Sequence, residues 1–180
     1  MPELPEVETV KESLKLRLNN KKIIKVRVLW DNIIAYPSKE DFIKEIANQC
    51  INDVKRRGKF LMFDLDDYYL LSHLRMEGKY FFKTKDDDIN KHEHVIFDLD
   101  DGSELRYMDT RKFGKMYLIK KEDIDKIGPL VELGLEPWDD NLTSEYLLDK
   151  YKKKKLPIKS VLLDQSIIVG IGNIYADEIL

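Results

Sequence analysis

The sequence predicts an α+β protein, in which a β-rich part with helices at its edges is followed by the beginning of an all-helical part. Short alternating apolar segments fill residues 60–119, and turns containing Asp separate them, which indicates strands. Glycine, proline and tryptophan gather at residues 128–138, which suggests a linker. Beyond it, apolar residues recur at helical spacing, so the class of structure is expected to change there.

The first elements are expected to be a helix over residues 5–18, a strand over residues 24–28 and a second helix over residues 42–51. Pro5 suits the first position of a helix, and the glutamates after it suit the positive end of the helix dipole. Asn19-Asn20 is a plausible stop for this helix.

Two hairpins and one further strand are expected in the β-rich part. Asp100-Asp101-Gly102 is the stronger turn signal, since Asp-Gly suits a tight hairpin turn. The expected strands are residues 60–65, 69–74, 95–99, 104–108 and 113–119, the last of which would continue the meander.

In the helical part, Thr143 can cap a helix that runs to about Lys155, and Pro157 opens a second helix through Leu163. The chain then stops at Leu180 inside an apparent helix that has no C-cap. Compact domains rarely end in this way, so we expect that further sequence is missing.

We therefore expect two domains. The first, over residues 1–134, is β-rich, and the second, over residues 135–180, is helical and incomplete. No internal repeat is visible in either one.

Composition excludes several classes of protein and favours none. No apolar run approaches the roughly 20 residues of a membrane span, and no signal peptide is visible. Cys50 is the single cysteine, which excludes an internal disulfide or a cysteine-rich zinc site in these residues and fits a reducing cytoplasm. The net charge of −3 is not that of a basic nucleic-acid-binding domain. Basic residues do cluster at 55–59 and 150–155, but such runs usually only solvate a surface.

The N-terminal stretch MPELPEVE contains two residues, Pro2 and Glu3, that a helix starting at Pro5 does not explain. Methionine is usually removed before proline, which would leave Pro2 as a free secondary amine. Because an α-amino group has a pKa near ~8, a useful fraction is unprotonated at neutral pH. Such an amine can attack a sugar C1′ to give an iminium ion, while Glu3 protonates a leaving group or the ring oxygen. The alternative is that Pro2 is merely tolerated.

Three more motifs each have a structural and a functional interpretation. Lys59 in RRGKF is either a solvated strand end or a group for phosphate binding or proton transfer. A methionine near a glycine turn, such as Met76 in SHLRMEGK, usually fills a gap in the apolar core. Arg111 and Phe113 in DTRKFG are expected on one face of a strand. They are either ordinary alternation or the cation and aromatic wedge that DNA-kinking proteins push between stacked bases.

The stretch VGIGN precedes the last expected helix. It is no dinucleotide fingerprint, because Tyr175 stands where the third glycine would be. Two glycines before a helix either form a tight turn or expose backbone N–H groups to a phosphate, with the Asn173 side chain as a further donor.

Together these stretches resemble one family, the formamidopyrimidine-DNA glycosylases (Fpg or MutM) of bacterial base-excision repair. The resemblance covers essentially the whole chain, and MPELPEVE at the N-terminus is highly specific. Leu4 favours this branch over the related endonuclease VIII branch, which carries PEGPE. The other matching stretches are KRRGKF, HLRMEGK, KHEHV, LRYMDTRKFG, LGLEP and IKSVLLDQSIIVGIGNIYADEIL.

The resemblance implies an N-terminal antiparallel β-sandwich flanked by helices, followed by the start of a helix-two-turns-helix DNA-binding domain. It implies a bifunctional DNA glycosylase and AP lyase that removes 8-oxoguanine and formamidopyrimidines from duplex DNA. Pro2 would be the nucleophile that forms a Schiff base with the damaged nucleotide's sugar. Glu3 would be the acid that assists departure of the base, and Lys59 a proton donor in strand scission.

The resemblance also implies DNA contacts. Met76, Arg111 and Phe113 would fill the gap left when the lesion flips out, and Arg111 would face the orphaned cytosine. The implied phosphate contacts are His73, His92, Lys154 and Asn173, and Glu77 is implied to face the lesion. The expected partner is duplex DNA with oxidised purines or abasic sites, bound by a monomer in the bacterial cytoplasm and away from membranes.

Family members continue for roughly another third of their length. There they complete the helical domain and carry a loop over the everted base and a four-cysteine zinc finger. None of these lies in the 180 residues, so no cofactor is expected in this chain. Weak DNA binding is also expected, because losing phosphate contacts lowers affinity.

Three hypotheses follow. The chain is an active glycosylase, at least within a full-length protein, or a catalytically impaired or inactive DNA-binding remnant. The third hypothesis is a generic protein-binding module, which leaves Pro2-Glu3 and the Arg111/Phe113 pair unexplained.

Overall fold

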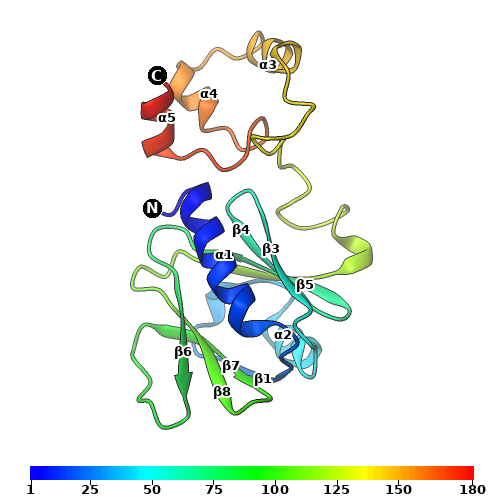
Figure 1. Ribbon diagram of the computed structural model, residues 1–180, viewed down its shortest axis with the longest axis vertical. Helices are drawn as coiled ribbons and strands as arrows, with labels where there is room; N and C mark the ends of the chain where they lie inside the picture. The colour runs from blue at the N-terminus through cyan, green and yellow to red at the C-terminus, as the bar shows by residue number, and fades with distance from the viewer.

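The computed structural model describes residues 1–180 as two stacked β-sheets beside a helical part (Figure 1). One sheet has the strand order β1 (Ile23–Val28), β7 (Glu93–Leu99), β8 (Ser103–Met108) and β6 (Lys79–Thr84). The other has the order β2 (Ile34–Tyr36), β9 (Lys115–Lys120), β5 (Tyr68–His73), β4 (Phe60–Asp64) and β3 (Asp53–Arg57). Neighbouring strands are antiparallel except β2 and β9. The expected β-sandwich is therefore confirmed.

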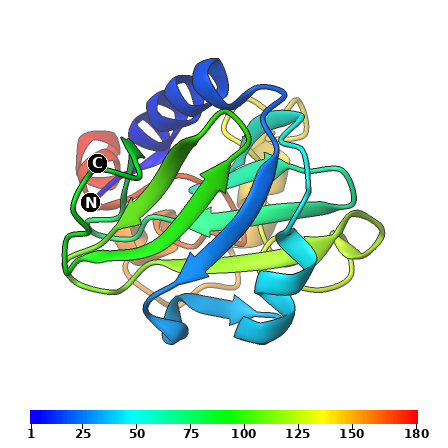
Figure 2. The same ribbon diagram turned by 90° about the horizontal axis from the view of Figure 1, so that it is seen from below.

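The two sheets share one apolar core. Val95, Phe97 and Leu105 from one sheet and Val54 and Phe63 from the other belong to a single buried cluster. Their alternation along each strand directs every second side chain between the sheets. Figure 2 shows the sheets stacked one behind the other with their strands crossing. The core thus accounts for most of the apolar positions from which the strands were expected.

Helices close the two edges of the sandwich. Helix α1 (Leu4–Leu18) packs against β3, and α2 (Lys39–Ile46) packs against β1 and β2 (Figure 2). The α1 helix begins at Leu4, so Pro5 occupies its second position rather than its first. Short 3₁₀ turns, η1 (Asp31–Ile33) and η2 (Lys121–Asp123), precede β2 and follow β9.

The second helix is shorter than expected, because it ends at Ile46 and not near residue 51. Asn48 has a φ of +65°, a left-handed conformation that cannot continue a helix. The backbone beyond it pairs with the start of β1 instead, where the Ile23 N–H donates to the Gln49 carbonyl at 2.9 Å. Apolar spacing alone did not reveal this competition for backbone hydrogen bonds.

The sheet topology corrects two further expectations. Both hairpins, β4–β5 and β7–β8, are confirmed, but β3 and β6 were not expected. They lie at sheet edges, where polar residues mask the pattern; in β3 only Val54 is fully buried. The last strand, β9, does not continue the meander. It crosses to the other sheet and pairs with β5, because the segment 109–114 between β8 and β9 is a loop.

The helical part contains α3 (Ser144–Tyr151), α4 (Ile158–Leu162) and α5 (Asn173–Ile179), which surround a small cluster of Val161, Ile167 and Ile168. Thr143 caps α3 as expected, but the helix ends at Tyr151 rather than near residue 155. No helix is both long enough and apolar enough to cross a membrane.

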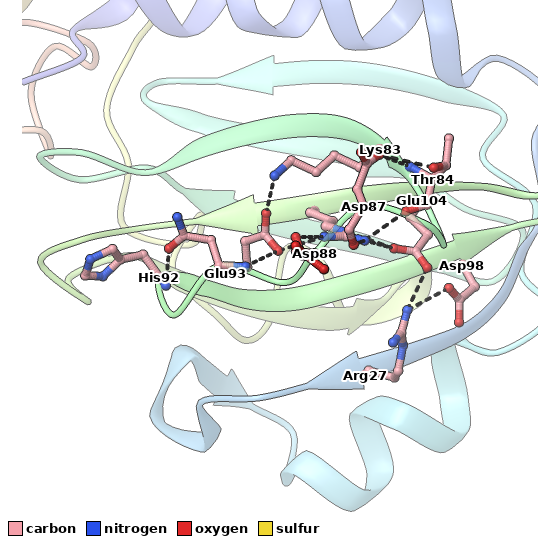
Figure 3. A network of polar contacts seen from close by, with 11 residues as sticks. Arg27, Lys83, Thr84, Asp87, Asp88, His92, Glu93, Asp98 and Glu104 are labelled. Carbon is pink, nitrogen blue, oxygen red and sulfur yellow. Dashed lines mark hydrogen bonds and ion pairs between the residues drawn. The ribbon is translucent and has the colours of Figure 1, made fainter.

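A charged network covers the outer face of β7 and β8. Figure 3 shows Glu93 and Asp98 on β7 and Glu104 on β8, with Arg27 reaching from β1 to Glu104. Arg106 lies among them with only 1% of its surface exposed, and pairs with Glu93 at 2.9 Å and Glu104 at 2.8 Å. Its guanidinium also donates to the carbonyls of Thr84, Asp87 and Asp88. The loop before β7 is therefore folded around one buried cation.

Replacing this cation should destabilise the sandwich. We expect Arg106→Ala to lower the free energy of unfolding by about 3–5 kcal/mol, because two buried carboxylates lose a partner. Lys25→Ala removes a loose, mostly exposed partner of Asp98 at 3.8 Å and should cost under ~1 kcal/mol. Urea denaturation of both variants checks this, and equal losses would contradict it.

Candidate active site at the junction of the sandwich and the helical part

The N-terminus of the chain lies beside α5, where the sandwich meets the helical part (Figure 1). The Glu3 carboxylate is 1% exposed and accepts three backbone hydrogen bonds from the start of α5. The donors are the N–H groups of Gly172 at 2.9 Å, Ile174 at 2.8 Å and Tyr175 at 3.2 Å. The first N–H groups of a helix have no partner within the helix, so Glu3 supplies one. Residues 170 positions apart in sequence are thereby held at one point.

The neighbouring backbone fixes the same junction. The Leu4 N–H donates to the Gly170 carbonyl at 3.1 Å, and the Glu3 N–H donates to the Glu6 carboxylate at 2.9 Å. Pro2 therefore lies between Met1 and the anchored residues Glu3 and Leu4. Its nitrogen is bonded to the Met1 carbonyl carbon here. Pro2 becomes a free amine only when Met1 is removed.

A hollow of about 650 Å³ opens beside Pro2 and runs along α1. Glu6, Met76 and Glu77 line it together with Pro2. Glu77 and Pro2 therefore line one cavity. Glu6, which sequence reasoning assigned only to the helix dipole, belongs to the same cavity.

Lys59 follows the turn between β3 and β4 and is only 9% exposed. Gly58 before it has a φ of +57°, a backbone conformation that is unfavourable for residues with a side chain. The Gly58 N–H donates to the Glu136 carboxylate at 2.8 Å. Burial lowers the pKa of the Lys59 ammonium, and the nearby Glu3 carboxylate partly opposes that shift. Lys59 is therefore closer to losing its proton at neutral pH than an exposed lysine.

A second hollow, of about 280 Å³, lies between Lys59 and α5. Its lining includes Met1, Lys59, His73, Arg75 and Asn173. Two basic side chains, Lys59 and Arg75, and the Asn173 side chain line one space here, which suits an anion such as a phosphate. Arg75 was quoted in its motif but was not among the candidate site residues.

His73 packs edge-on against Phe60 with ring centroids 4.8 Å apart. Burial, followed by the positive charges of Arg75 and Lys59, lowers the pKa of His73 to about 3. The ring is therefore neutral at physiological pH. Its Nδ1 accepts the Arg75 N–H at 3.0 Å, which leaves the proton on Nε2 as a possible donor.

Two loops carry exposed side chains beside this junction. Met76 is 39% exposed and Phe113 is 49% exposed, and both line a hollow of about 370 Å³ with Met1 and Arg75. The Arg111 guanidinium lies 4.8 Å from the centre of the Phe113 ring. Met76 is therefore not core filling, and Arg111 and Phe113 lie on a loop rather than on one face of a strand.

Two candidate residues from the sequence, His92 and Lys154, do not line the three hollows described above. His92 lies just before β7 and is half-buried. Lys154 follows α3 and forms an ion pair with Asp164 at 2.8 Å.

The structure also adds Gln165, which nothing in the sequence singled out. Its side chain accepts the Gly170 N–H at 2.8 Å and donates to the Ile171 carbonyl at 2.9 Å, so it shapes the VGIGN turn. A role of this kind leaves no signal in a single sequence, because it depends on backbone groups that only the fold brings near.

No group of three or more His, Cys, Asp or Glu side chains is arranged to hold a metal ion. Cys50 is free and is the single cysteine, so these 180 residues cannot provide a four-cysteine zinc site. We derive no chemical step through zinc.

The Glu3 junction leaves no space for a side chain at residue 172, since a Cβ there would overlap the Glu3 carboxyl group. We expect Gly172→Ala to cost about 1–3 kcal/mol in the free energy of unfolding, the usual cost of overpacking. Combined with Glu3→Ala, the same substitution should cost less than the sum of the two single changes, because the overlap is gone. Urea denaturation of the three variants checks this; strict additivity would contradict it.

Known proteins resemble both parts of the chain. Residues 1–116 match the model of the formamidopyrimidine-DNA glycosylase N-terminal domain, and residues 133–180 match the model of the formamidopyrimidine-DNA glycosylase H2TH domain. The chain is 49% identical to the formamidopyrimidine-DNA glycosylase of Cytobacillus firmus and 48% identical to that of Bacillus subtilis, each over 181 residues. Both alignments cover 100% of this chain and 66% of the relative, so the chain spans about 66% of the length of these curated relatives.

Solved structures agree with the sequence relatives. The Lactococcus lactis Fpg in complex with DNA containing an abasic site superposes with a TM-score of 0.91 at 37% identity, covering 99% of this chain and 65% of that one. The complex of Lactococcus lactis Fpg with DNA containing Fapy-dG gives a TM-score of 0.91 at 37% identity. This match covers 99% of this chain and 67% of the Lactococcus lactis chain. The match extends over both the sandwich and the helical part. The chain therefore belongs to the formamidopyrimidine-DNA glycosylase family.

Proposed function

We propose that the chain provides the catalytic residues of a bifunctional DNA glycosylase and AP lyase of base-excision repair. Its substrates are oxidised purines, 8-oxoguanine and formamidopyrimidines, in duplex DNA, in the cytoplasm of a bacterium. The observation that carries the proposal is the junction itself: Pro2 lies next to the fixed Glu3 carboxylate, and that carboxylate is close enough to the buried Lys59 to affect its lowered pKa. Relatives that are named for this activity, and relatives solved with damaged DNA, support it.

The chemistry follows from these groups. Once Met1 is removed, the Pro2 nitrogen attacks C1′ of the damaged nucleotide, forming a C–N bond as the glycosidic bond breaks. Glu3 takes up the proton that the attacking amine loses and supplies it to the departing base. Opening of the sugar ring then gives the iminium ion. In the following elimination, C2′ loses a proton and the 3′ phosphate leaves, with Lys59 as a proton donor.

The exposed residues of the two loops are assigned to the DNA. Met76, Arg111 and Phe113 enter the gap that the everted nucleotide leaves, with Arg111 towards the orphaned cytosine. The proposed phosphate contacts are His73, His92, Lys154 and Asn173, and Glu77 is proposed to face the lesion. Because His73 is neutral, we assign it a hydrogen bond from Nε2 rather than a charge contact.

A second candidate function is a DNA-binding remnant with impaired catalysis. The apolar side chains of Ile174, Ile179 and Leu180 on and after α5 are more than half exposed, at 61%, 57% and 63%. Exposed patches of this kind favour association with other molecules, which would compete with DNA binding.

A borohydride trap tests the proposed function. The purified chain is incubated with a duplex that contains 8-oxoguanine opposite cytosine and, separately, with an abasic-site duplex. We expect a covalent adduct on both and much less with Pro2→Gly, because the primary amine of glycine gives an imine that needs a proton to become an iminium ion, whereas the secondary amine of proline gives the iminium ion directly. An adduct on the abasic duplex alone would favour the impaired remnant. No adduct, with the intact mass showing that Met1 is removed, would refute the proposal.

Lys59 should affect strand scission without affecting Schiff-base formation. We expect Lys59→Ala to slow scission of a preformed abasic site about 100-fold, the usual contribution of a positioned acid or base, while the borohydride adduct still forms. In the wild type, the donor is lost as pH rises through the lowered pKa. Scission should thus decline with pH below the value of 10.5 for a free lysine, and Lys59→Ala should lack this decline. An unchanged alkaline limb in Lys59→Ala would contradict the role.

A further inference from the structure

The loop between β8 and β9 is folded around one buried carboxylate. Asp109 is 0% exposed, and its Oδ1 accepts the N–H groups of Arg111 at 3.0 Å and Lys112 at 3.1 Å. Its Oδ2 accepts the Gly114 N–H at 2.8 Å and the Tyr107 hydroxyl at 3.1 Å. Four donors meet this carboxylate, and three of them are backbone groups of the loop that presents Arg111 and Phe113. The conformation of that loop therefore depends on Asp109.

The loop needs such support because it contains an unfavourable backbone conformation. Lys112 has a φ of +59°, which is uncommon for a residue with a side chain. The loop before β6 has the same feature, since Arg75 has a φ of +56°. These two loops carry the three exposed side chains assigned to the gap in the DNA. Each must be held in its conformation by interactions outside its tip.

The Tyr107 hydroxyl lies between the two loops. Tyr107 is 0% exposed, and a Cβ added to either Gly78 or Gly114 would overlap its hydroxyl oxygen. One glycine follows Met76 and Glu77, and the other follows Phe113. Burial raises the pKa of Tyr107, as do Tyr80 and Asp109, so the hydroxyl keeps its proton and remains a donor to Asp109. Both loops are thus packed against one hydrogen-bonded pair.

Other contacts complete the connection. The Thr110 hydroxyl donates to the Glu77 carboxylate, directly from one loop to the other. The backbone of Asp109 also bonds to the segment at the start of β7. Its N–H donates to the His92 carbonyl at 2.9 Å, and its carbonyl lies 2.7 Å from His94 Nε2. Asp109 is therefore linked to all three segments that carry Met76, His92 and Arg111.

We propose that the Tyr107–Asp109 pair holds the Met76 loop and the Arg111/Phe113 loop in register, and thereby sets discrimination between bases opposite the lesion. Asp109 and Tyr107 are positioning residues, because both are buried and act through the exposed side chains. The inference rests on the proposed function, since it needs Arg111 to face the orphaned base. It assigns a role to residues that the chemistry at Pro2 does not use.

The central test is Asp109→Asn. The amide has nearly the same size, but it brings an NH₂ group to a place where only donors converge. We expect the ratio of excision of 8-oxoguanine opposite cytosine to that opposite adenine to fall about tenfold, the effect of losing one hydrogen bond to a charged group. Trapping on an abasic duplex should stay within about twofold of the wild type, because Glu3 and Leu4 anchor Pro2 to the start of α5 and not to either loop. Equal losses in both assays would indicate a merely structural role and overturn the proposal.

Tyr107→Phe keeps the ring and removes only the hydroxyl, so it carries the test if Asp109→Asn does not fold. We expect a smaller fall in the same ratio. Tyr146→Phe is the matched control, because it removes a hydroxyl that donates to the Ile167 carbonyl at 2.9 Å in the helical part, away from both loops. Its ratio should equal that of the wild type. A Tyr107→Phe ratio equal to that of Tyr146→Phe would overturn the role of the hydroxyl.

A double substitution separates direct from indirect action. If Asp109 acts only through the loop, Asp109→Asn should change the ratio no further in an Arg111→Ala background. An additional fall there would contradict the proposal.

Amide hydrogen exchange tests the link between the loops without any catalysis. Asp109→Asn should speed exchange at Lys112 and Gly114 and also at Gly78 in the other loop. Faster exchange confined to Lys112 and Gly114 would overturn the link. A wild-type chain that fails to form adducts would refute the proposed function, while the exchange result still decides whether Asp109 holds the loops.

Discussion

The hydrogen bonds between the Glu3 carboxylate and the start of α5 place Pro2 and Glu3 against the helix that begins with Asn173. A carboxylate buried in this way is tolerated only when donors replace the water it loses. The first turn of a helix offers such donors, because its N–H groups have no partners within the helix. The same three bonds satisfy both groups and join the first residues of the chain to the last helix. Glycines at 170 and 172 keep the distance short enough, since a side chain at either would overlap Leu4 or Glu3.

The loops and turns that carry the candidate site residues are supported by buried or partly buried charged side chains rather than by apolar packing. Arg106 folds the loop before β7, Asp109 folds the loop before β9, and Glu136 holds the turn before Lys59. Backbone donors and acceptors in such loops cannot pair within a sheet, so a charged side chain takes their place. The side chains at the loop tips remain exposed, as their proposed insertion into DNA requires. The polar support therefore explains how a rigid loop can present Phe113 to solvent.

Much of the fold could be predicted from local patterns. Alternating apolar residues and an Asp-Gly turn correctly indicated the β7–β8 hairpin, and Thr143 correctly indicated the start of α3. The failures occurred where distant residues compete for the same backbone. Residues after Ile46 pair with the start of β1, and β9 leaves its neighbour in sequence to pair with β5. The edge strands β3 and β6 were missed because polar residues occupy much of their surface.

The sequence by itself determined the family and the class of fold, and it supplied the residues that we propose as nucleophile, acid and proton donor, because their motifs are short and local. The tertiary structure alone decided what each environment does to that chemistry. It buried Lys59 and lowered its pKa, kept His73 neutral, and turned the segment containing Arg111 and Phe113 into a loop. It also revealed Asp109 and Tyr107 as the pair between two loops. The burial, the pKa and the hydrogen-bond partners of a side chain depend on residues far apart in the chain. A single sequence does not show which of those residues lie close together in space.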